Sequence, residues 1–198
     1  MAEGVAGPPA IGPTGLLAAG SAQPTAAGVA GLIDPTEVIG PCGLPADVVA
    51  ALIRGGQTVA TAESLTGGLI TACLTAVPGA SQVVRGGLVV YSADLKTALA
   101  GVPAELIEAA GVVSAPVARR LAVGASRRCR ADWGIGVTGV AGPGPSAGVA
   151  AGVVWLALAG PDGLTAERLA LPGDRATVRA GVVVAACRAL ADRLEAIS

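Results

Sequence analysis

The stretch "TVATAESLTGGLITACLTAV", residues 58–77, decides the fold class. It begins as a short apolar strand over 58–62, passes through a turn rich in polar residues and glycine, and continues as an apolar helix that stops at Pro78-Gly79. A strand that turns into a helix is the basic unit of α/β domains. Ligands of such domains bind where strand and helix meet, so the stretch predicts both a fold class and the place of a site.

The alternation of strands and helices continues outward from this stretch. Further strands are expected at 86–92, 131–139, 153–159 and 164–172, the last two as an antiparallel hairpin around the turn 160–163. Helices are expected from Pro45 to Gly55 and over 93–101, 103–111, 115–130 and 174–198. Strands separated by helices predict an α/β fold, a layered α/β/α domain with a mixed, mostly parallel sheet.

The N-terminal segment differs in composition from the rest of the chain. Residues 1–43 are rich in Ala, Gly and Pro and show no sustained hydrophobic period. We interpret them as a flexible extension, with one domain over 44–198. A total length of 198 residues suits one domain with a tail.

Charge and hydropathy exclude several classes of protein. The net charge of −1 argues against a nucleic-acid partner. No apolar run reaches the about 20 residues of a membrane span, and the N-terminus has no basic signal-peptide region, so we expect a cytoplasmic protein without a membrane partner. The one arginine-rich segment, 118–130, is interpreted as a solvated helix face, with an anionic partner as the alternative.

Residue usage also restricts the chemistry. The chain has no histidine, which excludes a Ser-His-Asp triad, a Cys-His dyad and imidazole metal ligands. Its four cysteines are far apart and form no CxxC pair, so no metal site is expected. We interpret them as small buried apolar residues in a reducing compartment.

Ser64 lies just beyond the strand of the opening stretch. The N–H groups at the start of the following helix can face it, and Thr66, Gly67 and Gly68 would let the backbone approach a bound group closely. Such donors can bind an anion or a developing oxyanion. The alternative is that Ser64 or Thr66 only caps the helix and the glycines only shape the turn.

Tyr91 stands at the end of the next predicted strand and Lys96 follows about a turn later; they are the chain's one tyrosine and one lysine, against twelve arginines. Arginine stays protonated near neutral pH, whereas a desolvated lysine can lose its proton. A neutral lysine can accept a proton from a serine, as in Ser-Lys hydrolases. The alternative is that one surface lysine has survived compositional drift by chance.

Two further clusters could bind a substrate. Thr138 and Gly139 end a predicted strand and enter the glycine-rich loop "VAGPGP", whose amides could face a phosphate or a carboxamide. Asp174 can cap the last helix, and Arg175 and Arg179 lie one turn apart on it, which suits a phosphate ester. The alternatives are an ordinary turn and a solvated Asp–Arg pair.

The motifs "AESLTGG", "YSADLK", "GVVS", "VTGVAGPG" and "PGDR" occur in this order. Together they resemble the CinA C-terminal-domain family, also called the PncC family of nicotinamide mononucleotide amidohydrolases, over roughly residues 44–197. The resemblance implies hydrolysis of nicotinamide mononucleotide to nicotinic acid mononucleotide and ammonia, a step of pyridine nucleotide salvage, without metal or cofactor. Larger members carry an additional N-terminal molybdopterin-binding-like domain, and we expect this chain to be the stand-alone form.

The resemblance also implies residue roles. Ser64, Tyr91 and Lys96 match catalytic positions of the family, while Thr138 and Arg175 match its substrate-binding threonine and the arginine of its GDR motif. We expect Lys96 to activate Ser64, with Tyr91 assisting, a small-molecule nucleotide as substrate and a homo-oligomeric assembly. The alternatives are a non-catalytic nucleotide-binding or regulatory module on the same fold, or an amidase for another substrate.

Overall fold

The computed structural model describes residues 43–197, so the predicted flexible extension lies outside it except for Gly43 and stays a prediction. A five-stranded sheet with the order β2-β1-β3-β4-β5 forms the centre of this part of the chain. Its strands are β1 (Val59–Glu63), β2 (Val84–Val89), β3 (Trp133–Gly139), β4 (Val153–Gly160) and β5 (Gly163–Ala170). β1 pairs in parallel with β2 and β3, whereas β4 pairs antiparallel with β3 and β5. Four of the five strands therefore point the same way.

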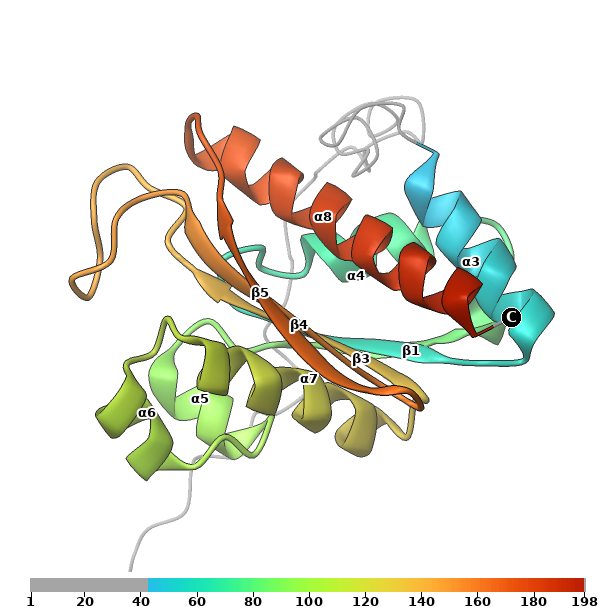
Figure 1. The fold of residues 1–198 in the computed structure, drawn as a ribbon, viewed down its shortest axis with the longest axis horizontal. Coiled ribbons are helices and arrows are strands. Elements are labelled where there is room, and N and C mark those ends of the chain that lie inside the picture. Colours follow the sequence, from blue (N-terminus) through green and yellow to red (C-terminus); the bar gives the residue numbers. More distant parts are fainter. Residues whose placement is uncertain (1–42, 198) are drawn as a thin grey trace, which may run out of the picture. The chain divides into compact units, whose positions relative to one another are not determined.

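Helices cover both faces of the sheet (Figure 1). On one face lie α3 (Leu44–Gly55), α4 (Leu69–Thr75) and α8 (Arg175–Ala196), and on the other α5 (Ala93–Ala98), α6 (Ala104–Ala110) and α7 (Ala115–Cys129). The predicted layered α/β/α domain with a mixed sheet is confirmed. Within residues 43–197, no helix combines the length and the apolar character needed to cross a membrane.

Each face of the sheet has its own apolar core. The α3, α4 and α8 side buries large residues such as Leu52, Ile70, Ile135 and Leu190. The α7 side is lined mostly by small residues, with Val117 and Leu121 of α7 packed against alanines of β1. On one face, large side chains fill the space between the sheet and its helices. On the other, small residues let the helix pack close to the sheet.

Glycine in β3 makes that close approach possible. A Cβ added at Gly136 would overlap the backbone of α7 at Ala118 and Ala122. With no side chain there, α7 lies directly on the sheet and the backbones of helix and strand come into contact.

The predicted boundaries of β2 were wrong. β2 runs over Val84–Val89, not 86–92, because Val84 already pairs with Val59 although it precedes Arg85 and two glycines. The chain leaves the sheet after Val89. As predicted, a polar turn from Ser64 to Gly68 separates β1 from the apolar helix, which begins at Leu69.

Candidate active site

A pocket of about 240 Å³ opens where the parallel strands end. Ser64 directly follows β1, Tyr91 lies two residues beyond β2, and Thr138 and Gly139 are the last residues of β3. Lys96 of α5 and Arg175 of α8 also line the pocket. Residues from five separate elements thus meet at the carboxyl edge of the parallel strands, where α/β folds bind their ligands.

Lys96 is buried beside Ser64, with only 1 % of its surface exposed. Its Nζ lies 3.0 Å from Ser64 Oγ and donates to the carbonyl oxygens of Val90 at 2.7 Å and Tyr91 at 3.3 Å. A neutral amine carries two hydrogens and one lone pair. The two carbonyls can take both hydrogens, which leaves the lone pair facing the Ser64 hydroxyl.

Burial also changes the proton affinity of this amine. Desolvation lowers the pKa of Lys96 to about 8 from its ordinary 10.5, and the charge of nearby Asp94 raises it by a smaller amount. Among residues 43–197, no aspartate or glutamate lines the pocket to stabilise the ammonium form. Near physiological pH the neutral form of Lys96, which a general base requires, is therefore still the minor form but far more populated than in an ordinary lysine.

Glu63 anchors the turn that presents Ser64. Its fully buried carboxylate accepts hydrogen bonds from the N–H groups of Gly68, Ile70 and Thr71 at 2.8–3.0 Å. The hydroxyls of Thr61 and Thr71 lie within 3.0 Å and 2.7 Å of the same carboxylate. These bonds saturate the N-terminus of α4 and fix the residue next to Ser64.

Sequence reasoning missed Glu63, although a signal was present. It is the one acid in an otherwise apolar or small strand, "VATAE", and α4 has a glycine as its N-cap and no acidic residue in its first turn. An acid at the end of a buried strand, followed by an uncapped helix, indicates a carboxylate that caps the helix from the sheet.

The predicted oxyanion donors of this turn need correction. The N–H of Gly67 donates to the Ser64 carbonyl at 3.1 Å and the N–H of Gly68 to Glu63, so both already have acceptors. Neither residue lines the pocket, and neither does Thr66, whose hydroxyl is buried without a hydrogen-bond partner among residues 43–197. The pocket instead includes Leu65, the residue directly after Ser64.

Arg179 also has a different role from the one predicted. Its guanidinium donates to the Thr66 carbonyl oxygen at 2.7 Å and does not line the pocket. The bond ties the start of α8 to the serine turn. One turn of helix separates Arg179 from Arg175, but only Arg175 lines the pocket.

Arg175 and Tyr91 form the outer wall of the pocket. The Arg175 guanidinium donates to the Tyr91 hydroxyl at 3.2 Å and to the Gly142 carbonyl oxygen at 3.0 Å. The Tyr91 side chain is 60 % exposed, and its recorded contact with Lys96 runs through its backbone carbonyl, not its phenol. The phenol is therefore placed to orient Arg175, whereas the backbone of the same residue orients Lys96. Asp174 caps α8 as predicted, accepting from the Thr177 N–H at 2.8 Å.

The glycine-rich loop after β3 closes another side of the pocket. Residues 140–147 line it together with Thr138, whose hydroxyl donates to the Val112 carbonyl at 2.8 Å. That bond links β3 to the turn before α7, so Val112 also reaches the pocket wall. Thr138 and Gly139 thus lie where the sequence predicted.

Comparison with known proteins identifies relatives of this chain. The profile of the family described as CinA C-terminal domain matches residues 43–194. A CinA-like protein of Anaeromyxobacter sp. is 53% identical over 137 residues, which are 69% of this chain and 33% of that protein. A CinA-like protein of Parasynechococcus marenigrum is 47% identical over 154 residues, 76% of this chain and 37% of that protein. The chain therefore spans about a third of the length of these curated relatives.

Solved structures of similar size share the fold. The competence damage-inducible protein A (ComA) of Klebsiella pneumoniae superposes with a TM-score of 0.75 at 34% identity, over 77% of this chain and 95% of that one. The competence/damage inducible protein CihA of Agrobacterium tumefaciens gives the same TM-score and identity, over 82% and 98%. The resemblance noted in the sequence motifs is thereby confirmed.

Proposed function

Because this chain belongs to the CinA C-terminal domain family, we propose that it hydrolyses the carboxamide of nicotinamide mononucleotide, with Ser64 as nucleophile and Lys96 as base. The products are nicotinic acid mononucleotide and ammonia. The family resemblance supports the choice of substrate, and the arrangement of side chains supports the reaction type.

One observation carries the proposal: the amine of Lys96 is buried 3.0 Å from the Ser64 hydroxyl. A buried ammonium without a carboxylate partner is costly. A protein has little reason to retain such a group unless the neutral amine has a use. In a chain without histidine, this pair supplies the proton transfer that an imidazole provides in other hydrolases.

The reaction runs through an acyl-enzyme. Lys96 takes the proton of Ser64 as Oγ attacks the carboxamide carbon, giving a tetrahedral oxyanion. The Leu65 N–H, next to the nucleophile, is our candidate donor to that oxygen. As the C–N bond breaks, Lys96 returns the proton to the departing nitrogen, which leaves as ammonia. Lys96 then activates a water that hydrolyses the ester and regenerates Ser64.

Arg175 is the candidate ligand of the substrate's 5′-phosphate. It is exposed, lines the pocket and is held by the Tyr91 hydroxyl and the Gly142 carbonyl, neither of which carries a formal negative charge that would compete with a phosphate. A planar guanidinium can bind two phosphate oxygens at once. On this proposal the phosphate of the substrate lies at Arg175, its carboxamide lies at Ser64, and the loop 140–147 contacts the part of the nucleotide between them.

The deciding experiment is an end-point assay for ammonia released from nicotinamide mononucleotide. We expect release from the unmodified chain and none above background from Ser64→Ala, which keeps the pocket but lacks the nucleophile. Binding of the nucleotide without any ammonia would rule out the hydrolase and indicate a non-catalytic binding module.

The rate is expected to follow the titration of Lys96. The base must be neutral, so kcat/KM rises about tenfold per pH unit below about pH 8 and levels off above it. Asp94 is fully exposed and raises the pKa of Lys96. Asp94→Asn should therefore move the midpoint of the profile to lower pH. Initial rates of ammonia release across the range test this, and a midpoint that Asp94→Asn leaves in place would argue against Lys96 as the titrating base.

Arg175→Gln is expected to raise KM for nicotinamide mononucleotide by about 30-fold while kcat changes less than about threefold, since the lost contact binds the phosphate in the ground and transition states alike. Steady-state kinetics measure both constants. Arg168→Gln, an exposed change of the same charge on β5, is the matched control. Unchanged KM in Arg175→Gln would point to an amide substrate without a phosphate.

A further inference from the structure

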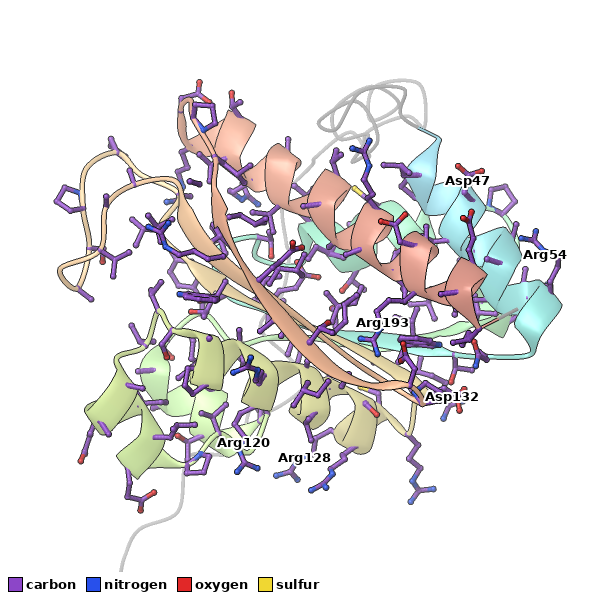
Figure 2. All side chains as sticks on the ribbon, viewed as in Figure 1. Asp47, Arg54, Arg120, Arg128, Asp132 and Arg193 are labelled. Atoms are coloured by element: carbon purple, nitrogen blue, oxygen red, sulfur yellow. The ribbon has the colours of Figure 1, made fainter. Side chains whose placement is uncertain are left out.

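A second hollow lies on the outer side of α7. It has a volume of about 260 Å³ and is lined by Ala100 and Gly101 after α5 and by five residues of α7: Arg120, Val123, Gly124, Arg127 and Arg128. None of these residues lines the pocket that holds Ser64 and Lys96. Figure 2 shows Arg120 and Arg128 extending from α7 away from the sheet.

The spacing along α7 creates this hollow. Arg120, Gly124 and Arg128 succeed one another at four-residue intervals, so they lie on one face of the helix, with Arg127 beside them. A Cβ at Gly124 would overlap the carbonyl of Ala100. Because Gly124 has no side chain, α7 packs closely on the end of α5 and the space between the arginines stays open.

The three guanidinium groups have no anionic partner in the part of the chain that the structure describes. Among residues 43–197, no hydrogen bond or ion pair involves the side chains of Arg120, Arg127 or Arg128, and no acid lines the hollow. The groove between α3 and α8 differs, because its two arginines are accompanied by three acids. Like charges held together without compensation repel one another, and an anion between them relieves that repulsion.

We propose that the hollow bounded by Arg120, Arg127 and Arg128 is a binding site for a diphosphate group. A phosphate monoester carries about 1.5 to 2 negative charges at neutral pH, fewer than the three positive charges here. Adjacent phosphates match that charge, and each guanidinium can take two oxygens in its planar fork. The group could come from free pyrophosphate or from the diphosphate of a nucleotide.

Calorimetric titration of the full chain with sodium pyrophosphate tests the site. The Arg175→Gln background removes the phosphate ligand proposed for the other pocket. In that background we expect saturable one-to-one binding, weakened by added salt. Changing Arg120, Arg127 and Arg128 together to Gln should lower affinity at least about 30-fold, and each single change several-fold.

The matched control changes Arg119, Arg130 and Arg168 to Gln. These arginines are also exposed and carry the same total charge, but do not line the hollow, so affinity should fall less than about threefold through long-range effects. Equal losses in the two triple variants, or no saturable binding in the Arg175→Gln background, would overturn the proposal.

A parallel titration with uridine diphosphate identifies the source of the group. Equal affinity for both probes indicates that the diphosphate of a nucleotide is accepted with its nucleoside outside the hollow. Binding of pyrophosphate alone indicates the free anion. All the changed arginines are exposed, so a thermal melt suffices to verify folding, and the single variants remain informative if a triple variant is unstable.

Discussion

Lys96→Met lowers the rate of ammonia release from nicotinamide mononucleotide by about 10³-fold, on the proposed mechanism. Methionine has nearly the volume of lysine but no amine, so Ser64 loses both the base that activates it and the acid that protonates the leaving nitrogen. Removing the amine relieves its unfavourable burial but takes a donor from the carbonyls of Val90 and Tyr91, so we expect a folded variant of similar or slightly lower stability. Single-turnover assays give the rate, and the fluorescence of the two tryptophans confirms folding.

Two companion variants make that result specific. Lys96→Arg retains the positive charge but cannot be deprotonated near neutral pH, so it should be equally inactive. Leu95→Met introduces the same side chain at the neighbouring, exposed position of α5 and should retain nearly full activity. Turnover by folded Lys96→Met at the unmodified rate would eliminate the proposed base.

Glu63→Gln is expected to lower the free energy of unfolding by about 3 kcal/mol. The buried carboxylate accepts from three backbone N–H groups, and an amide of the same shape offers one oxygen and one NH₂ that cannot accept. At least one donor at the start of α4 then stays unsatisfied in the interior. The turn next to Ser64 is loosened too, so kcat should fall while KM, set by Arg175 and the loop, changes less.

Urea denaturation followed by tryptophan fluorescence measures this loss. Glu167→Gln, the same change at an exposed position of β5, serves as the control and should shift stability by less than about 0.5 kcal/mol. Equal stability of Glu63→Gln and Glu167→Gln would show that the five hydrogen bonds to Glu63 contribute little to the free energy of unfolding.

The fold could be predicted because the buried strands and helices are apolar segments separated by turns rich in glycine, proline and polar residues. The boundary of β2 was harder. Arg85 and two glycines resemble a turn, but β2 is an edge strand beside β1, where a charged residue and glycines are tolerated. At the other end, Val90 leaves the sheet although it looks strand-like, and its carbonyl turns to accept from Lys96.

The sequence predicted the two reactive side chains of the site better than the hydrogen bonds that hold the surrounding turn. Rarity in the composition pointed to Lys96, and a strand end pointed to Ser64; the structure places these two side chains 3.0 Å apart. The roles of Gly67, Gly68 and Arg179 depended on which backbone groups were already bonded. The bond from Arg179 to Thr66 joins residues over a hundred positions apart, which no local pattern contains, whereas the acceptors of the Gly67 and Gly68 amides, Ser64 and Glu63, lie in or next to the same turn.

The proposed nucleophile and the proposed phosphate ligand lie on different parts of the structure. Ser64 follows Glu63, whose buried carboxylate holds the start of α4. Arg175 lies at the start of α8, and residues 140–147 form a loop. If the proposed function holds, changes in that loop can alter which phosphorylated amide is bound while Ser64 and Lys96 stay the same. On this proposal, substrate specificity could change through the loop and Arg175 without any change at Ser64 and Lys96.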